Sequence, residues 1–209
     1  MVVDAILARL GGIVTALAAS LALAVAPAPV PKTGAAPWPA PKDPVALTRK
    51  AGLVPEVNEH LQYHVHSHLD IFVNGKKVKV PAGIGIDTKD PAVHSGQLPD
   101  GSAAYGGIVK CPQVCISPLH THGDYGLLHT ETTKPKPNTL GEFFTEWNVR
   151  LDKTCIGGYC KPDSIVVYVN GKAYRGDPRL ILLADHTEIA IVIGTPPERI
   201  PKTFPAVPL

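Results

Sequence analysis

The pattern of apolar and polar positions divides the chain into an apolar leader, a proline-rich stretch and a longer part typical of alternating strands and turns. No charged side chain occurs in residues 10–30, and Pro27 would end a helix begun there. This apolar run is intermediate in length between a secretory signal and a membrane-spanning helix. We therefore expect residues 1–28 to be a signal peptide or membrane anchor, with a buried helix of the folded part as the alternative.

Alanine and proline are abundant in the next segment, residues 29–55, which predicts a semi-rigid tether. It ends in a short expected helix with Asp43 as its N-cap, Pro44 in its first turn and Gly52 after its end. Residues 56–200 remain for a single histidine-rich, β-rich domain, which is long enough for a core of its own.

Strict alternation predicts a half-buried strand over residues 64–73. Its apolar face carries Val65, Leu69, Ile71 and Val73, with Ser67 as an interruption. Its other face carries His64, His66, His68 and Asp70. The sequence Asn74-Gly75 then predicts a type I′ hairpin turn into a return strand over residues 76–80.

A second hairpin is expected from residues 119–122 and 127–132, after a loop-like stretch over residues 82–107. The apolar positions of residues 139–151 fall on one helical face, and Thr139 with Glu142 forms a capping box. Apolar strands are expected over residues 165–169 and 189–193, and the first of them is expected to turn at Asn170-Gly171. These elements predict an α+β fold, mostly antiparallel sheet with one main packed helix. The order of the C-terminal elements resembles a β-grasp arrangement, a likeness of topology that implies no chemistry.

The charge composition argues against one class of function, nucleic-acid binding. The 209 residues include 20 Lys and Arg and 18 Asp and Glu, for a formal net charge of +2. This near balance lacks the basic surface of nucleic-acid binders, so no nucleic-acid partner is expected.

Four cysteines, Cys111, Cys115, Cys155 and Cys160, all lie in the expected folded part. An even number in an exported chain favours two disulfides, of which three pairings can be drawn. The alternative is a four-thiolate zinc site, but the spacings C-x3-C and C-x4-C differ from the usual C-x2-C.

Histidines supply the candidate chemistry. His64, His66 and His68 alternate along one strand, so their rings share a face and can share a metal ion. The alternative is that this face belongs to an edge strand and is simply solvated.

The second hairpin carries a sharper set, His120, His122 and His129, with Glu131 on the face of His129. Three imidazoles with one open position are typical of catalytic zinc, and a nitrogen-rich set also suits copper(II). Glu131 or Asp124 is a candidate to orient a ligand or act as a base. Coincidence is the alternative, and whether the two histidine sets form a joint site stays open. His60, His94 and His186 are interpreted as ordinary polar residues.

Several motifs occur in one order: residues 64–75, 80–86, 119–122, 129–131 and 139–144. Together they resemble an uncharacterised group of exported bacterial and archaeal proteins over about residues 63–194. The resemblance implies that the hairpin histidines and Glu131 act as a set. In that group an Asp is expected directly after His-Thr-His, whereas here Gly123 holds that place and Asp124 follows.

These observations predict an exported protein, released or held at the outer face of the cytoplasmic membrane by its N-terminal segment alone, that binds zinc or copper(II) through clustered histidines. One alternative is a metal-free envelope domain whose hairpin edges bind a protein partner. Another is a metal-dependent hydrolase or lyase.

Overall fold

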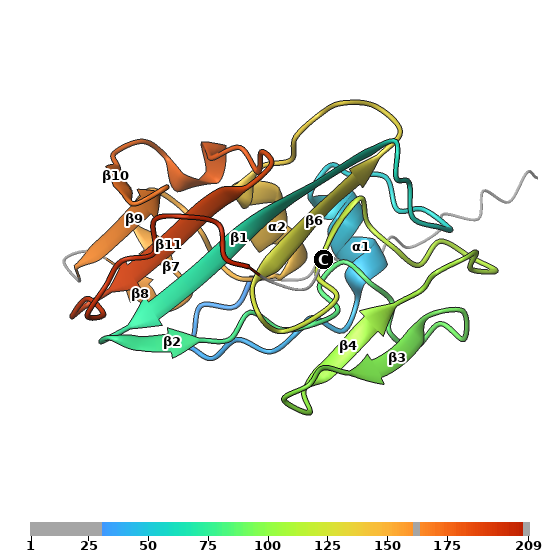
Figure 1. Cartoon of the computed structure of the whole chain (residues 1–209), viewed down its shortest axis with the longest axis horizontal. Helices are drawn as coiled ribbons and strands as arrows, with labels where there is room; N and C mark the ends of the chain where they lie inside the picture. The colour runs from blue at the N-terminus through green and yellow to red at the C-terminus, as the bar shows by residue number, and fades with distance from the viewer. Residues whose placement is uncertain (1–30, 161–163, 207–209) are drawn as a thin grey trace, which may run out of the picture.

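The computed structural model describes residues 31–160 and 164–206, and its centre is a seven-stranded sheet (Figure 1). The helices are α1 (Pro44–Lys50), α2 (Leu140–Glu146) and the 3-10 helix η1 (Pro178–Leu180). The strands are β1 (Tyr63–Val73), β2 (Lys76–Val78), β3 (His94–Gln97), β4 (Ala103–Gly106), β5 (Leu119–His120), β6 (Leu127–Thr132), β7 (Cys155–Ile156), β8 (Tyr159–Cys160), β9 (Ile165–Val169), β10 (Lys172–Tyr174) and β11 (Thr187–Ile193). The leader predicted for residues 1–28 lies outside the described residues. Among the described helices, none has the length and apolar character needed to span a membrane.

The main sheet is mixed, with strand order β10-β9-β11-β1-β6-β5 and with β2 also paired to β1. Strands β1 and β11 run parallel, and the other pairs are antiparallel. This confirms a mostly β fold. The expected short helix forms as α1, and the expected main helix forms as α2 with only 7 residues. The β-grasp likeness of the C-terminal half is not confirmed, because β1 lies between β6 and β11.

Both asparagine–glycine turns form as predicted. Asn74 and Asn170 have φ angles of 48° and 49°, and the following Gly75 and Gly171 have 77° and 74°. Two consecutive residues with positive φ define the type I′ turn, which Asn-Gly adopts at low cost. The two turns connect β1 to β2 and β9 to β10.

Strand β1 is buried on both faces, which corrects the prediction of a half-buried strand. Every residue from Ser67 to Phe72 is buried, because β1 lies in the interior of the sheet between β6 and β11. The C-terminal segment also crosses the sheet (Figure 1). On the face that carries the histidines, the ring of Phe204 lies edge-on to that of His68, with centroids 6.4 Å apart. The interpretation of this face as the solvated side of an edge strand is therefore wrong.

The hydrophobic core lies on the opposite face, between the sheet and α2. Phe143, Phe144 and Trp147 of this helical segment are each at most 1% exposed. Trp38, from the segment expected to be a tether, packs edge-on against Trp147 with ring centroids 5.7 Å apart. Trp147 also donates a 3.2 Å hydrogen bond to the carbonyl of Trp38, so this part of the segment is joined to the domain.

Helix α2 begins as predicted and ends earlier. The capping box of Thr139 and Glu142 is present. The helix ends at Glu146, however, because Asn148 adopts a φ of 56° and Val149 forms a bridge with Lys32. At α1, Asp43 occupies the N-cap position, but its side chain makes no capping hydrogen bond.

Two regions expected to be loops contain small hairpins. Strands β3 and β4 pair within the stretch of residues 82–107, and β7 and β8 pair between Cys155 and Cys160. The four cysteines form the disulfides Cys111–Cys115 and Cys155–Cys160. This confirms two disulfides and excludes the four-thiolate zinc site.

Candidate metal centre

Strand register brings the two predicted histidine sets together on the sheet face opposite α2. His66 of β1 lies opposite His129 of β6, and His64 lies opposite Glu131. His129 in turn lies opposite His120 of β5. Partners in register place their side chains on the same face, so five histidines and one glutamate form a single cluster. We call it the histidine cluster: His64, His66, His120, His122, His129 and Glu131.

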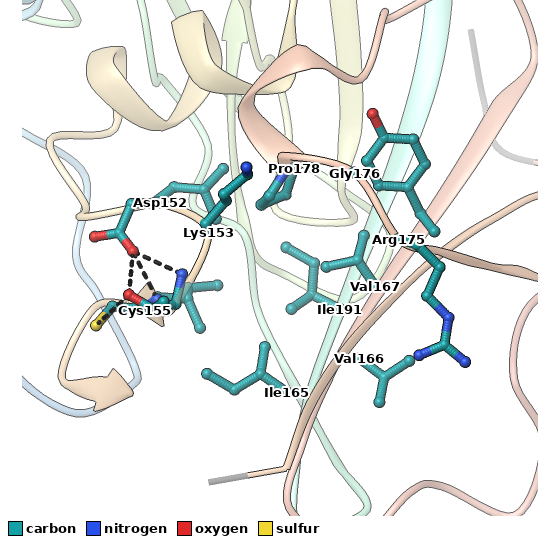
Figure 2. A pocket seen from close by; sticks show the side chains of 14 residues that line it. Asp152, Lys153, Cys155, Ile165, Val166, Val167, Arg175, Gly176, Pro178 and Ile191 are labelled. Carbon is teal, nitrogen blue, oxygen red and sulfur yellow. Dashed lines mark hydrogen bonds between the residues drawn. The ribbon is translucent and has the colours of Figure 1, made fainter. Parts of the chain in front are cut away.

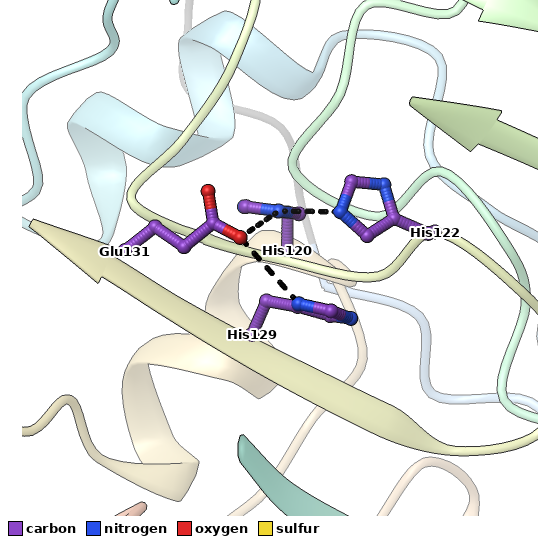
Figure 3. A group of neighbouring side chains, drawn as sticks. All are labelled: His120, His122, His129 and Glu131. Atoms are coloured by element: carbon purple, nitrogen blue, oxygen red, sulfur yellow. Dashed lines mark hydrogen bonds and ion pairs between the residues drawn. The ribbon is translucent and has the colours of Figure 1, made fainter. Parts of the chain in front are cut away.

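One group within the cluster consists of His120, His122, His129 and Glu131, whose donor atoms all lie within 4.8 Å of one another (Figure 3). The Nε2 atoms of His120 and His122 are 3.2 Å apart. Oε1 of Glu131 lies 3.7 Å from Nε2 of His120 and 3.5 Å from Nδ1 of His129. Four donor groups from β5, β6 and the turn after β5 therefore converge on one point.

Backbone contacts fix the tautomers of two of these rings. Nδ1 of His120 lies 2.9 Å from the carbonyl of Ser117, and Nδ1 of His122 lies 2.5 Å from the carbonyl of Tyr105. A carbonyl only accepts, so each Nδ1 donates its hydrogen and each Nε2 of the neutral ring keeps a bare lone pair. The two lone pairs face each other across 3.2 Å.

A glycine allows this arrangement at His122. A Cβ atom at Gly106 would lie 3.1 Å from Nδ1 of His122. The absence of a side chain there lets β4 approach the ring closely enough for the carbonyl of Tyr105 to accept its hydrogen.

Burial keeps the rings neutral. Desolvation, reinforced by the neighbouring His122, holds the pKa of His120 well below its ordinary value. Desolvation and the surrounding imidazoles likewise lower the pKa of His129 to about 2. The pKa values of His66 and His122 are also lowered, mainly by burial. At neutral pH these four rings therefore offer lone pairs, the form in which imidazole binds metals.

A second group overlaps the first: His64, His66 and His129 also place donor atoms within 4.8 Å of one another. Nε2 of His66 lies 3.1 Å from Nδ1 of His129. Nε2 of His64 lies 3.2 Å from Oε1 of Glu131. Two atoms at this junction, Nε2 of His129 and Oε2 of Glu131, are buried without a hydrogen-bond partner among the described residues.

His68, predicted as a ligand with His64 and His66, faces a different set of partners. Its Nδ1 lies 2.9 Å from Oε2 of Glu188, and its Nε2 lies 2.9 Å from the carbonyl of Tyr125. Burial opposes the charged ring, but the hydrogen bond and charge of Glu188 raise the pKa of His68 overall. Burial also raises the pKa of Glu188 against the opposing effect of His68. Because both ring nitrogens face acceptors, we place the proton on His68.

The charges around His68 balance one another. Asp70 lies beside His68, and its Oδ1 forms an ion pair with Nζ of Lys77 at 2.5 Å. Two carboxylates, one imidazolium and one ammonium sum to zero charge. Although His68, Asp70 and Glu188 have the spacing of a metal group, their charges are satisfied by protein groups. This arrangement favours a structural role for His68.

The remaining sequence candidates lie apart from the histidine cluster. Asp124 pairs with Lys79 at 2.5 Å and accepts a hydrogen bond from Ser102 at 2.9 Å. His60 pairs with Glu56, and His94 and His186 are exposed.

Two carboxylates that lie beside predicted histidines were themselves not predicted: Glu188 next to His68 and Glu59 next to His122. Glu188 is the one charged residue in the apolar run of β11, and a lone charge in such a strand indicates a buried partner that the sequence analysis did not use. Glu59 lies in an irregular segment, with Oε1 3.9 Å from Nε2 of His122. Burial, with a contribution from Glu131, raises the pKa of Glu59 to about 7. No local pattern in the sequence marks it.

A buried carboxyl supports the segment that holds His120. Ser117, whose carbonyl accepts the hydrogen of His120, donates its hydroxyl to Oε1 of Glu146 at 2.5 Å. Glu146 is 0% exposed, and burial raises its pKa to about 8 even though the bond from Ser117 opposes the rise. This carboxyl is therefore protonated at neutral pH and links α2 to the centre.

This raised pKa predicts a pH-dependent stability. The folded protein holds a proton on Glu146 that the unfolded chain releases above its ordinary pKa, so the stabilisation is full in acid and is lost as the pH rises toward 8. Between pH 5 and pH 8 we expect the wild type to lose up to about 4 kcal/mol that Glu146→Gln does not lose. Urea unfolding of both proteins, with chelator present, measures the difference. Glu198→Gln, at an exposed position, is the control, and equal pH slopes in wild type and Glu146→Gln would contradict the assignment.

A separate hollow lies between the β7–β8 hairpin and the sheet (Figure 2). It holds about 300 Å³, and its lining includes Ile165, Val167 and Ile191 but no histidine. Partial burial raises the pKa of Asp152 at its rim, but hydrogen bonds from Thr154, Arg150 and the amide of Cys155 lower it to about 2 overall. This carboxylate therefore serves the local turn, and the described residues that line the hollow include no cluster of metal-binding groups.

Comparison of the chain with protein-family models, with curated proteins and with solved structures finds no match. The candidate centre is therefore interpreted from its own geometry.

Proposed function

We propose that this chain is an exported protein that binds a transition-metal ion, zinc or copper(II), through His120, His122, His129 and Glu131. The observation that carries the proposal is the pair of facing lone pairs on His120 and His122, 3.2 Å apart and mostly buried. Two acceptors at this distance repel each other unless a cation lies between them. A proton is disfavoured there by desolvation, whereas a metal ion binds both nitrogens at once.

The spacing of the donors fits a coordination sphere. Zinc–nitrogen bonds of about 2.0–2.1 Å in a tetrahedron place neighbouring donors about 3.3 Å apart. In the histidine cluster, His120 and His122 place their donors 3.2 Å apart, and the donors of His129 and Glu131 are 3.5 Å apart. The donors of His120 and Glu131 are 3.7 Å apart and the remaining pairs lie within 4.8 Å, so these donors would move closer together to enclose an ion.

The chemistry of the donors favours zinc or copper(II). Imidazole nitrogens with one carboxylate suit both ions, whereas an all-oxygen shell would favour magnesium or calcium. Thiolate ligands, which copper(I) prefers, are not offered, because the four cysteines form two disulfides.

Two features support export. The apolar leader has the composition of a signal or anchor, and disulfides persist mainly in oxidising compartments. Held by that leader or released from it, the domain would meet metal ions outside the cytoplasm.

The test is the metal content of the full chain, purified after export through an oxidising compartment and dialysed against zinc or copper(II). We expect wild type to retain metal, and His120→Ala/His122→Ala to bind it at least about 100-fold more weakly, since even outer-shell changes cost about 10–100-fold. His94→Ala/His186→Ala, which removes two exposed histidines, is the matched control and should behave as wild type. A wild type that retains neither metal would overturn the proposal and leave a metal-free interaction domain.

A further inference from the structure

Building on the proposed function, we infer that the histidine cluster holds two metal ions side by side. The second ion lies between His64, His66 and His129, with Glu131 at the boundary between the two positions.

The number of donors exceeds the needs of one ion. Five imidazoles and one carboxylate meet in the cluster, whereas a zinc ion in a protein site takes four ligands. The two groups of convergent donors share His129 and differ in their other members. His120 and His122 belong to the first group, and His64 and His66 belong to the second.

The second group has the donor spacing of a coordination sphere in its own right. Nε2 of His66 is 3.1 Å from Nδ1 of His129, and Nε2 of His64 is 3.2 Å from Oε1 of Glu131. Both distances match the separation of about 3.3 Å between neighbouring ligands of a tetrahedral zinc ion. These pairs are formed across β1 and β6, whereas the first position is formed on β5, β6 and the turn after β5.

The residues at the junction have spare donor atoms. Glu131 approaches His64, His120 and His129 with Oε1 alone, while its Oε2 is buried without a partner among the described residues. His129 likewise approaches His66 and Glu131 through Nδ1, while its Nε2 is buried without a partner. Buried polar atoms without partners are costly. With two cations bound, Oε1 and Oε2 of Glu131 would each bind one ion. His129 would bind one ion through each ring nitrogen after releasing its ring proton to solvent, because a neutral imidazole offers only one lone pair.

Access differs between the two positions. His120 is fully buried at the inner end of the cluster, whereas the side chain of His64 is 33% exposed at the outer end. Among the six donor residues, His64 is the most accessible, so the second ion is the one nearer to solvent. We therefore expect it to bind more weakly and to exchange faster than the inner ion.

The test is a titration of the metal-free full chain with zinc, followed by elemental analysis, and a parallel titration with copper(II) followed by electron paramagnetic resonance. Wild type should bind two equivalents, and the second copper should produce the broadening and half-field transition of a coupled pair. His64→Ala/His66→Ala should bind one equivalent with an uncoupled signal. His64→Ala alone, at an exposed position that leaves the sheet interior intact, should selectively weaken the second equivalent.

The outcomes separate this inference from the function on which it rests. One uncoupled equivalent in wild type and in both variants would overturn the second ion and leave the single-metal proposal standing. No bound metal in wild type would overturn the proposed function itself. Two equivalents in His64→Ala/His66→Ala would place the second ion elsewhere and would also overturn the inference.

Discussion

Zinc at a thousand times its dissociation constant is expected to raise the free energy of unfolding by about 4 kcal/mol. For a chain of this size, that gain corresponds to a rise of roughly 10 °C in the midpoint of thermal unfolding. The physical reason is that the folded protein brings together neutral, mostly buried imidazoles, while the unfolded chain offers no such assembled site. Differential scanning calorimetry with zinc and then with excess chelator measures the change.

The matched control for this result is His94→Ala, which removes one exposed histidine and should keep the full zinc-dependent rise. His120→Ala/His122→Ala should lose most of the rise, because only the more exposed and weaker position remains. An equal rise in this double variant would show that zinc stabilises the fold from another position, and a fall in the wild-type midpoint would show preferential binding to the unfolded chain.

Breaking the buried ion pair between His68 and Glu188 should have the second large effect. Glu188 is 1% exposed, and its Oε2 accepts the hydrogen on Nδ1 of His68 at 2.9 Å. Glu188→Ala leaves a buried imidazolium beside Asp70 alone, and loss of one partner of such a pair costs about 3–5 kcal/mol. Urea unfolding at pH 6 measures the loss.

A control variant and the pH dependence of the effect test the same ion pair. Lys79→Ala removes one partner of an exposed ion pair and should leave stability nearly unchanged. The raised pKa of His68 means that its ionic stabilisation is full below the ring's ordinary pKa and is lost as the pH rises through the folded-state pKa. The cost of Glu188→Ala should therefore shrink at high pH. A cost below that of an ordinary surface change at pH 6 would contradict a charged His68.

Local features of this fold were predictable because their causes lie within a few residues. The asparagine–glycine turns at Asn74 and Asn170 and the capping box at Thr139 each depend on neighbouring side chains. Two disulfides followed from the even cysteine count in a chain expected to be exported. Their pairing joins near neighbours in sequence, at separations of 4 and 5 residues.

Features that depend on distant pairings were not predictable. The burial of the polar face of β1 arises from its parallel pairing with β11, more than a hundred residues later, and from the C-terminal segment across it. The same pairing joins His68 to Glu188 and so separates His68 from the histidine cluster. Helix α2 ends early because Val149 forms a bridge with Lys32, a contact that the helical pattern does not reveal.

The candidate site was predictable in part. Each histidine set was visible as an i, i+2 pattern, but whether the sets meet depends on the register of β1 with β6, which pairs His66 with His129. The tautomers of His120 and His122 depend on the carbonyls of Ser117 and Tyr105, which the sequence does not identify as partners.

Anomalous X-ray diffraction at the zinc absorption edge, from crystals of the zinc-loaded full chain, tests most directly whether the histidine cluster holds metal. We expect a strong anomalous peak bounded by Nε2 of His120, Nε2 of His122 and the carboxylate of Glu131, the donors that converge in the structure. A peak beside His68 and Glu188, or at the exposed His94 or His186 with none at the cluster, would contradict it.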